Sequence, residues 1–471
     1  MTRSAKWLLA ILGIFLIAIY IGALRLGDLR KHTIEFEWLF FTAFAVYGVA
    51  CFISLQANAV DRRALFGIFA LAAVMQAVLI FSRPTLTDDM YRYVWDGRVQ
   101  AQGISPYRYP PNAPELVSLR DTEIYPSINR KPVVTVYPPA AEAAFFLLWK
   151  IAPDNVHWFQ FAMAAGGLTA GLLLMGLLKD LGYSPARALI YLWSPLLVFE
   201  TAHAAHVDGL VLPFLLGAWW ARVRERDGLT GFLLGIATAM KFYPALLLPF
   251  LWRPQNPKGR WTMPLTFVFT IGLFYAPYIL TSETSVLGYL PHYFRETFNI
   301  SPLVSMLNRL LDSVGVNIPY RLTALTLTAI LVAAIWHIFH PAPDAESALR
   351  RCILPIGIVT LLSQDLFAWY MLWLLPLTAL FLQPSAKRWK ALALPKLDAW
   401  FGWWLFCGLV ALSYTFFIRW KTVNSAALAE FIPLYLILCV SLLTTLWNSL
   451  SYICTAKPAK NAKKPFFTWR S

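Results

Sequence analysis

Two adjacent carboxylates, Asp88 and Asp89, stand at the start of a helix-like segment in the longest polar stretch of the chain, residues 82–136. A carboxylate in the first turn of a helix can remove a proton from a hydroxyl group or bind a metal ion. Acidic residues are also common at helix N-termini, because they interact with the positive end of the helix dipole. The residues themselves leave three alternatives open: a general base, a divalent-cation site and a structural helix start.

The helix that carries this pair is expected to follow a threonine N-cap, either Thr85 or Thr87, and to end at Gly103. Helical spacing places Arg92 and Trp95 on the same face as the first of the two carboxylates. We therefore expect a charged and aromatic surface on this helix next to the acidic pair.

A second polar cluster contains His203, His206 and Asp208, with Glu200 one helical turn earlier. Two histidines at i and i+3 have the spacing of zinc ligands. No further Cys or His partner is visible in the sequence, so we favour the alternative, in which these side chains form a cavity rim. A rim of this kind would hydrogen-bond a hydroxyl-rich or phosphate-containing ligand.

Two more charged residues interrupt apolar hairpins. Lys241 either extends toward the membrane surface or binds an anion, and we favour anion binding because the charge lies at the turn of its hairpin. Asp365, beside Trp369 and Tyr370, has the same ambiguity, and the sequence does not decide it. Nucleotide-binding motifs such as a Walker A loop are absent from the sequence, so a nucleotide substrate is not expected.

The elements that position these residues follow from composition. Of the 471 residues, 58% are apolar and only 14% are charged, whereas a soluble domain has about a quarter charged residues. The apolar residues form blocks long enough to cross a bilayer core about 30 Å thick. We predict an all-α polytopic membrane protein with roughly 11–14 transmembrane or partly spanning helices. The longest blocks are Trp7–Leu24, Phe36–Leu55, Ala64–Phe81, Phe161–Leu178, Pro264–Leu280, Leu322–Phe339 and Ile432–Leu446.

The net charge of +15 indicates orientation and not nucleic-acid binding, because no soluble segment is long or basic enough to form a binding domain. Basic residues accumulate in cytoplasmic loops of membrane proteins. On this basis both termini lie in the cytoplasm. The clusters used are Arg3/Lys6, Arg62/Arg63, Lys179/Arg187, Arg222/Arg224/Arg226, Arg253/Lys258/Arg260, Arg350/Arg351, Lys387/Arg388/Lys390/Lys396 and the tail from Lys457.

The same alternation predicts one membrane domain over residues 1–456 and a basic cytoplasmic tail over 457–471. Residues 82–136 and 281–319 become outer loops, and Tyr137–Trp149 is expected to lie in the interface or to re-enter. Three hairpins turn at His203–Asp208, at Lys241 and at Gln364–Asp365. Their legs are about 18 Å long, too short to span the core, and short helices are tolerated where they line an aqueous cavity.

Several motifs, taken in order along the chain, resemble a known superfamily. The segment from Asp88 to Gly97, the turn from Gly103 to Tyr107 and Tyr137-Pro138-Pro139 resemble the first outer loop of GT-C glycosyltransferases. The closest branch is that of the bacterial polyprenol-phosphate-mannose-dependent mannosyltransferases, with a more distant similarity to PIG-M-type enzymes. Later motifs of that branch are matched by Ser194-Pro195, by Glu200 to Asp208 and by Lys241 to Pro244. The resemblance extends from about Pro84 to Pro376.

This resemblance implies a GT-C fold and an inverting transfer of a sugar, mannose at the level of the family, from a polyprenyl-phosphate donor. The acceptor would be a hydroxyl group of a glycolipid or glycan on the outer face of the bacterial cytoplasmic membrane. The residues are equally consistent with another hexose or a pentose, and a divalent cation is left open. The implied base is Asp89 or Asp88, the implied phosphate ligands are Lys241, Arg92 and Arg295, and the implied sugar contacts are His203, His206, Asp208, Trp95, Tyr107 and Tyr137.

A transporter or lipid flippase is the rival interpretation, since such proteins also have broken helices and intramembrane charges. Many transporters contain internal repeats, and this sequence shows none. It concentrates its polar residues in one long outer loop instead. A lipid-linked-sugar ligase is a nearer rival, although its large loop is expected later in the chain.

Overall fold

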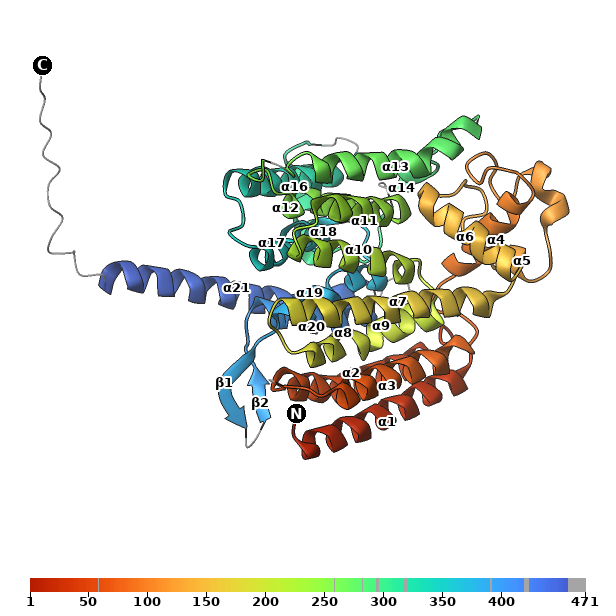
Figure 1. Cartoon of the computed structure of the whole chain (residues 1–471). Coiled ribbons are helices and arrows are strands. Elements are labelled where there is room, and N and C mark those ends of the chain that lie inside the picture. The colour runs from red at the N-terminus through yellow and green to blue at the C-terminus, as the bar shows by residue number, and fades with distance from the viewer. Residues whose placement is uncertain are drawn as a thin grey trace, which may run out of the picture.

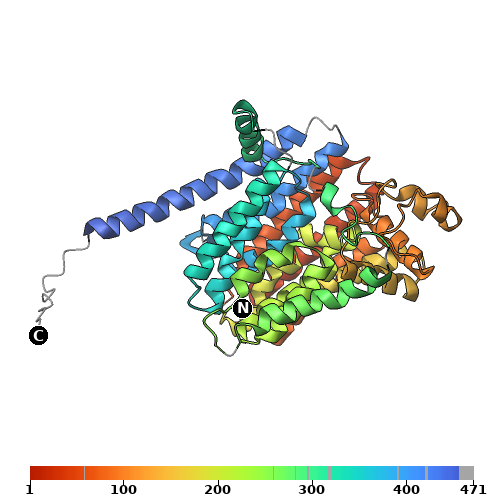
Figure 2. The ribbon, with the colours of Figure 1, turned by 90° about the horizontal axis from the view of Figure 1, so that it is seen from above.

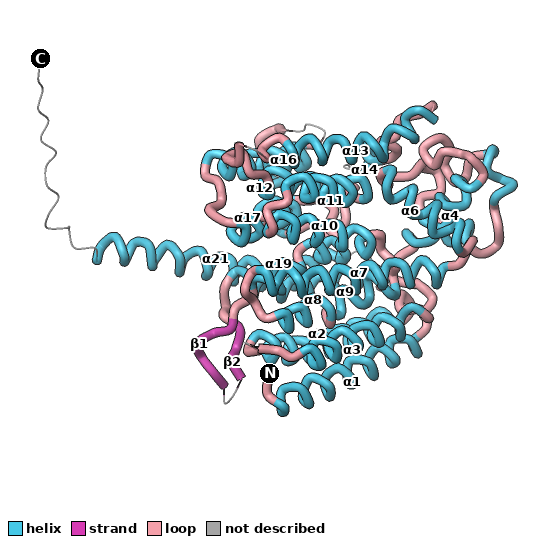
Figure 3. The backbone as a smooth tube through the Cα atoms, viewed as in Figure 1, coloured by secondary structure: helices cyan, strands magenta, loops and turns pink. Residues whose placement is uncertain are grey.

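A computed structural model describes residues 1–57, 59–257, 259–281, 283–293, 296–316, 320–389, 392–418 and 423–455. Within these ranges the protein is a bundle of helices with a single two-stranded antiparallel sheet (Figures 1 and 3). Arg295, Lys258, Lys390 and the tail from Lys457 lie outside the described residues. The sheet is formed by β1 (Pro384–Trp389) and β2 (Leu392–Pro395).

Three long apolar helices begin the chain, and the first of them packs against the other two. Side chains cap two of them, because Thr2 accepts a hydrogen bond from the backbone N–H of Ala5 and Asp61 accepts one from that of Ala64. The helices are α1 (Arg3–Leu26), α2 (Thr33–Leu55) and α3 (Arg62–Ile80).

The long polar loop contains short helices at one end of the bundle (Figure 1). Asp88 occupies the N-cap position of its first helix, where neither threonine was found, but makes no side-chain capping hydrogen bond. The hydroxyl of Thr87 accepts a hydrogen bond from the N–H of Asp89, and that of Thr85 accepts one from Leu29. The segment Tyr137–Trp149, which was predicted not to cross the membrane, contains most of α6, a helix of 13 residues. The next helix, α7, starts at the same end of the bundle. The elements are α4 (Asp89–Ala101), η1 (Pro114–Leu119), α5 (Ile124–Ser127) and α6 (Pro139–Ile151).

The centre of the bundle is built from α7 and two broken hairpins. The first hairpin turns between η3 and α10, and the second between α11 and η4, so both turns lie where the sequence predicted them. The elements are α7 (Val156–Asp180), η2 (Pro185–Ala188), α8 (Leu189–Leu192), α9 (Pro195–Val198), η3 (Phe199–His203), α10 (Asp208–Val223), α11 (Asp227–Met240), η4 (Tyr243–Leu247), α12 (Leu248–Leu251) and α13 (Thr262–Thr281).

The remaining helices follow the second outer loop. The third broken hairpin turns between α18 and η5, again at the predicted position around Asp365. The elements are α14 (Leu290–Tyr293), α15 (Pro302–Ser313), α16 (Arg321–Phe339), α17 (Ala345–Arg351), α18 (Ile353–Leu362), η5 (Ala368–Trp373), α19 (Leu375–Phe381), α20 (Ala399–Leu409), η6 (Val410–Phe417) and α21 (Val423–Thr455).

Eight helices in the described part of the chain are long and apolar enough to cross a membrane. Shorter apolar helices at Asp227–Met240 and Ala368–Phe381 supplement them. The prediction of an all-α polytopic membrane protein is therefore confirmed. The eight candidate spans are Arg3–Leu26, Thr33–Leu55, Arg62–Ile80, Val156–Asp180, Thr262–Thr281, Arg321–Phe339, Ala399–Phe417 and Ala426–Thr445.

Contacts between turns fall into two groups, one at each end of the bundle. The turns assigned to the cytoplasm contact one another at the end that carries the N-terminus and β1–β2, and the outer segments do so at the end that carries α4 and α6 (Figures 1 and 2). The turns alternate as predicted, while the side of the membrane that each end faces stays a prediction. The pairs are Met1–Ala59, Asp180–Arg224, Glu225–Arg253, Tyr183–Glu346 and Arg350–Trp400 at the first end, and Leu29–Thr85, Arg30–Asp88, Ile80–His157 and Ser82–His203 at the second.

Backbone contact between α7 and α10 fixes the start of α10. A Cβ atom on Gly209 would lie 2.4 Å from the carbonyl oxygen of Met163, and one on Gly166 would lie 2.3 Å from that of Gly209. Small residues at such positions let membrane helices approach closely. Since Gly209 follows Asp208 directly, this contact also sets the position of the Asp208 carboxylate.

Gly209→Ala should therefore reduce the stability of the detergent-solubilised protein, by about 1–3 kcal/mol, because the added methyl group overpacks a backbone contact. Gly272→Ala in α13 is the matched control, since a Cβ atom there meets open space. Thermal unfolding of both variants measures the difference. Equal melting temperatures for the two variants would contradict this account of the helix contact.

Candidate functional site

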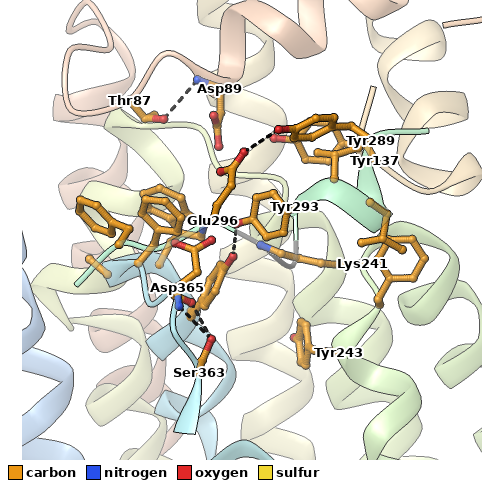
Figure 4. Close-up of a pocket in the computed structure, with 18 of the residues that line it drawn as sticks. Thr87, Asp89, Tyr137, Lys241, Tyr243, Tyr289, Tyr293, Glu296, Ser363 and Asp365 are labelled. Carbon is orange, nitrogen blue, oxygen red and sulfur yellow. Dashed lines mark hydrogen bonds between the residues drawn. The ribbon is translucent and has the colours of Figure 1, made fainter. Parts of the chain in front are cut away.

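A cavity of about 500 Å³ lies at the end of the bundle that carries the long polar loop. Its wall combines the start of α4 and the second outer loop with the turns of the second and third hairpins. The sequence analysis had named several residues that line it, some of which are shown in Figure 4: Asp88, Asp89, Arg92, Tyr137, Lys241, Asp365, Trp369 and Tyr370.

The two carboxylates of the acidic pair have different surroundings. Asp88 forms an ion pair with Arg30, at 2.9 Å from Nη1 to Oδ1, and occupies the N-cap position of α4 without a side-chain capping hydrogen bond. Asp89 points into the cavity (Figure 4), where Oδ1 accepts a hydrogen bond of 2.7 Å from the amide of Asn129. Its Oδ2 lies 3.9 Å from Nδ1 of His206. Asp88 is thus held by a cation, whereas Asp89 has an oxygen directed at a neutral or protonated imidazole.

Lys241 occupies the turn of the second hairpin and extends into the cavity (Figure 4). Its Nζ lies 2.5 Å from Oδ2 of Asp208 and 5.2 Å from the ring centre of Tyr370. The indole N–H of Trp373 donates to the other oxygen of Asp208, at 2.7 Å. Asp208 is fully buried and does not line the cavity, so it holds the lysine in place and has no surface to offer a sugar.

Arg92 lines the cavity from α4 but belongs to a buried ionic network. Its Nε donates to both oxygens of Asp96, at 2.8 and 2.9 Å, and its Nη1 donates to the carbonyl of Val133. Glu142 of α6 lies beside this pair and accepts a hydrogen bond of 2.6 Å from Thr135. Burial raises the pKa of the Glu142 carboxyl well above its usual range, and the Asp96 carboxylate adds to the shift. Burial also raises the pKa of Asp96, while the neighbouring Arg92 opposes that shift, so protonation is favoured more at Glu142 than at Asp96.

The two histidines of the first hairpin are each 1% exposed and lie behind the cavity wall. His203 contacts Ser82 through Nδ1, at 2.6 Å, and Thr85 through Nε2, at 3.2 Å, which ties η3 to the start of the long loop. His206 stacks on Trp369, with ring centres 3.9 Å apart. Neither histidine has surface for a direct sugar contact, and they do not converge on one point with Asp208.

The aromatic residues expected to contact sugar are divided between the cavity and the core. Tyr137 lines the cavity, whereas Trp95 packs on Tyr125 and Tyr107 donates its hydroxyl to the carbonyl of Tyr137. Both Trp95 and Tyr107 are buried away from the wall. Arg295, an expected phosphate ligand, lies outside the described residues.

Several residues of the cavity wall were not predicted from the sequence, because the residues that they contact are far away along the chain. Arg130 from the first outer loop pairs with Glu296 from the second, and Tyr289 donates to the same carboxylate at 3.1 Å (Figure 4). Asn129 and Arg30 complete this rim. The signal available in the sequence was their location in segments assigned to the outer side, but nothing indicated which of them would meet.

The third hairpin supplies an aromatic wall and one further carboxylate. Tyr370 stacks on Trp373, which stacks on Tyr243 with ring centres 3.8 Å apart. Asp365 is only 6% exposed, yet neither of its carboxylate oxygens has a hydrogen-bond partner among the described residues. The hydroxyl of Tyr293 interacts with this carboxylate. Unlike Asp208, Asp365 belongs to the cavity wall, where it lies beside aromatic rings.

One side of the cavity is apolar and lies between α16 and α18. The apolar residues there are Leu327, Ile330, Val359 and Leu362, with Thr326 beside them. Elsewhere on α16, large side chains such as Leu331 are exposed on the outer surface of the bundle. The cavity is therefore bordered on this side by helices that face the membrane.

A metal-binding site is not supported by the side chains that the structure describes, because no three His, Cys, Asp or Glu residues among them are close enough to hold an ion. His203, His206 and Asp208, whose spacing resembles that of zinc ligands, point to different partners. The structural arrangement instead resembles a site for a polar ligand with an anionic group.

The protonated Glu142 should make stability depend on pH. Because its pKa is raised in the folded state, the stability that it contributes is present at acidic pH and is lost as the pH rises through that pKa. Glu142→Gln should weaken this loss, so the melting temperature should fall less between acidic and alkaline buffers. Glu115→Gln in the exposed η1 serves as control, and a pH dependence that is identical in Glu142→Gln and the unmodified protein would refute the assignment.

Two comparisons with known proteins relate the middle of the chain to glycosyltransferases. Residues 135–363 match the sequence profile of glycosyltransferase family 87. Over 271 residues, 55% of this chain, the sequence is 23% identical to a polyprenol-phosphate-mannose-dependent alpha-(1-2)-phosphatidylinositol pentamannoside mannosyltransferase of Mycobacterium tuberculosis (strain CDC 1551 / Oshkosh). The alignment spans 60% of that protein. The chain is thus similar to glycosyltransferase family 87 through the middle of its bundle, which confirms the resemblance to GT-C glycosyltransferases.

Proposed function

We propose that the protein is a membrane glycosyltransferase that moves a sugar from a polyprenyl-phosphate donor to a hydroxyl group of a glycolipid or glycan. The observation that carries the proposal is the presence of Asp89 and Lys241 in the wall of one cavity (Figure 4). A carboxylate is suited to accept the proton of an attacking hydroxyl, and an ammonium group is suited to neutralise a leaving phosphate.

The reaction we propose is a single displacement. The acceptor oxygen attacks the anomeric carbon while Asp89 takes the proton from that oxygen. The bond between the anomeric carbon and the phosphate oxygen breaks, and its electron pair stays on the phosphate. Attack from the side opposite the leaving group inverts the configuration at the anomeric carbon.

Asp89 is preferred over Asp88 as the base because of its contacts. Asp88 is paired with Arg30, so its charge is already compensated. Asp89 has a neutral amide partner and faces the cavity. A carboxylate whose charge is less compensated is the stronger proton acceptor.

Lys241 is the proposed ligand of the donor phosphate. Its ammonium group has three N–H donors, and the described contact with Asp208 uses one of them. The apolar border between α16 and α18 would receive the first isoprene units of the donor. Mannose is the proposed sugar because the relative is named as a mannosyltransferase, and Asp365 with Tyr370 is the proposed contact for sugar hydroxyls.

We place this site at the outer face of a bacterial cytoplasmic membrane, with both termini on the cytoplasmic side. The support is the grouping of the basic turns at the end of the bundle opposite the cavity. The relative's name points to a lipid-linked donor and a glycolipid acceptor, which are used at membrane surfaces. A transporter or flippase would instead move its substrate without changing it.

Purified protein should transfer radiolabelled mannose from polyprenyl-phosphate-mannose to an extracted lipid acceptor. Asp89→Asn should lower kcat by about 10²–10⁴-fold, the usual contribution of a general base, while Asp88→Asn should lower it less. Full turnover by Asp89→Asn would show that the base is another residue. Substrate uptake into proteoliposomes without sugar transfer would favour the transporter.

Lys241→Met is made together with Asp208→Asn, so that no buried carboxylate is left unpaired. It should raise the KM for the donor about 10- to 100-fold relative to Asp208→Asn alone, because a charge-assisted hydrogen bond to the phosphate is lost. The matched control is Lys150→Met, which removes an exposed lysine of α6 at the same end of the bundle. Donor titrations of all three variants measure the effect. A donor KM in the double variant equal to that of Asp208→Asn would exclude the lysine as the phosphate ligand.

A further inference from the structure

A row of three ionisable side chains leads from the cavity into the core. Asp89 lies at the cavity, His206 lies behind it, and Glu200 lies behind His206. The Nδ1 atom of His206 is 3.9 Å from Oδ2 of Asp89, and its Nε2 atom is 3.3 Å from Oε2 of Glu200. His206 and Glu200 are each 1% exposed, so these two side chains are isolated from bulk water.

The orientation of the imidazole ring is fixed from several sides. Trp369 stacks on the ring at 3.9 Å with an interplanar angle of 21°. The hydroxyl of Tyr414 donates to Oε1 of Glu200 at 2.6 Å, which leaves Oε2 facing the imidazole. The ring therefore presents Nε2 to Glu200 and Nδ1 to Asp89.

The Nε2 and Oε2 atoms are 3.3 Å apart but are not aligned for a hydrogen bond, and each lacks another partner among the described residues. An imidazole that carries its proton on Nε2 would keep a lone pair on Nδ1, the nitrogen nearer to Asp89. A shift of about 1 Å would bring Nδ1 into hydrogen-bond range of Asp89. Distances between catalytic groups are often this long before substrate binds.

The backbone that presents His206 is irregular. Phe199–His203 forms a π-helical turn, and Ala205 has a left-handed φ of 55°. The N–H of His206 closes the segment by donating to the carbonyl of Glu200 at 2.9 Å. π-Helical turns and left-handed non-glycine residues cost free energy and cluster at functional sites. A segment that only packed against its neighbours would not need this geometry.

We propose that His206, held by Glu200, takes from Asp89 the proton that Asp89 removes from the acceptor hydroxyl. This inference rests on the proposed glycosyltransferase function. The proton moves from Oδ2 of Asp89 to Nδ1 of His206, which becomes an imidazolium between two carboxylates. When the products leave and water enters the cavity, the proton returns through Asp89 to the solvent.

The relay keeps a negative charge on Asp89 during the transfer. Positive charge develops at the anomeric carbon as its bond to the leaving phosphate breaks. A protonated Asp89 would no longer stabilise that charge, whereas a carboxylate that has passed its proton on does so. Among the basic side chains that the structure describes, His206 is the one within 4.0 Å of Asp89.

The test is chemical rescue of His206→Gly in the full-length protein. The variant should lose about 10²-fold in kcat with little change in the KM for donor or acceptor, because a proton-transfer group is removed. Added imidazole should restore part of kcat. In a series of substituted imidazoles of similar size, the rescued rate should rise with the basicity of the ring, which a purely structural filling of the cavity would not produce.

His203→Gly is the matched control, since it removes an equally buried histidine from the same segment whose ring contacts Ser82 and Thr85. If added imidazoles restore any kcat to His203→Gly, the restored rate should not depend on the basicity of the imidazole, whether or not the variant is less stable. Glu200→Gln provides a second variant that keeps the size of the side chain. It should lower kcat about 10-fold and leave both KM values unchanged, because the imidazolium loses a compensating charge.

The outcomes separate this inference from the proposed function. One outcome refutes the relay and leaves the proposed function standing. In that outcome the unmodified protein transfers sugar and Asp89→Asn does not, Glu200→Gln has a normal kcat, and the rescue of His206→Gly is independent of the basicity of the imidazole. If the unmodified protein transfers no sugar, the proposed function itself fails. Should His206→Gly not fold, the kcat of Glu200→Gln and of His206→Asn decides the question in the same way.

Discussion

The buried ion pair between Lys241 and Asp208 is the interaction on which the cavity depends. It joins the first hairpin to the second, and the indole of Trp373 joins the third hairpin to the same carboxylate. Removing either charge would leave the other uncompensated in a region where Asp208 is fully buried, a change that typically costs several kcal/mol. The three short hairpins cannot span a membrane core alone, and this pair fixes how their turns meet. The close approach of Gly209 to Met163 then fixes the position of this ion pair along the axis of the bundle.

Much of the fold could be predicted because it follows from local sequence properties. Apolar blocks identify helices, basic turns identify one end of the bundle, and the polar residues inside the hairpins identify their turning points. The structure has these turns at the expected positions. The direction of side chains around the first turn could not be predicted in the same way. His203, His206 and Asp208 are close in sequence, yet the π-helical turn and the left-handed Ala205 send each of them to a different partner.

Contacts between residues that are far apart along the chain could not be predicted from the sequence either. Arg130 and Glu296 are far apart in the chain, and their pairing depends on how the two outer loops fold over the cavity. The same holds for Arg30, which lies between the first two helices and still pairs with Asp88. For the acidic pair, the sequence left two candidates for the base, and the proposed choice of Asp89 rests on their different tertiary partners. The carboxylate of Asp89 lies beside the amide of Asn129 and the imidazole of His206, whereas that of Asp88 is paired with the guanidinium of Arg30.

Charge balance in the cavity favours a donor with little negative charge. The basic residues that the structure describes in the wall are each paired with a carboxylate: Arg30 with Asp88, Arg92 with Asp96, Arg130 with Glu296 and Lys241 with Asp208. Asp89 and Asp365 add two carboxylates without such a partner. A nucleotide diphosphate would therefore be repelled, because its charges would meet no free cation. A single phosphodiester next to Lys241 introduces one charge, and the sugar attached to it is neutral until the transition state. The negative wall then favours the positive charge that develops at the anomeric carbon, so the same residues that exclude a nucleotide assist the proposed transfer.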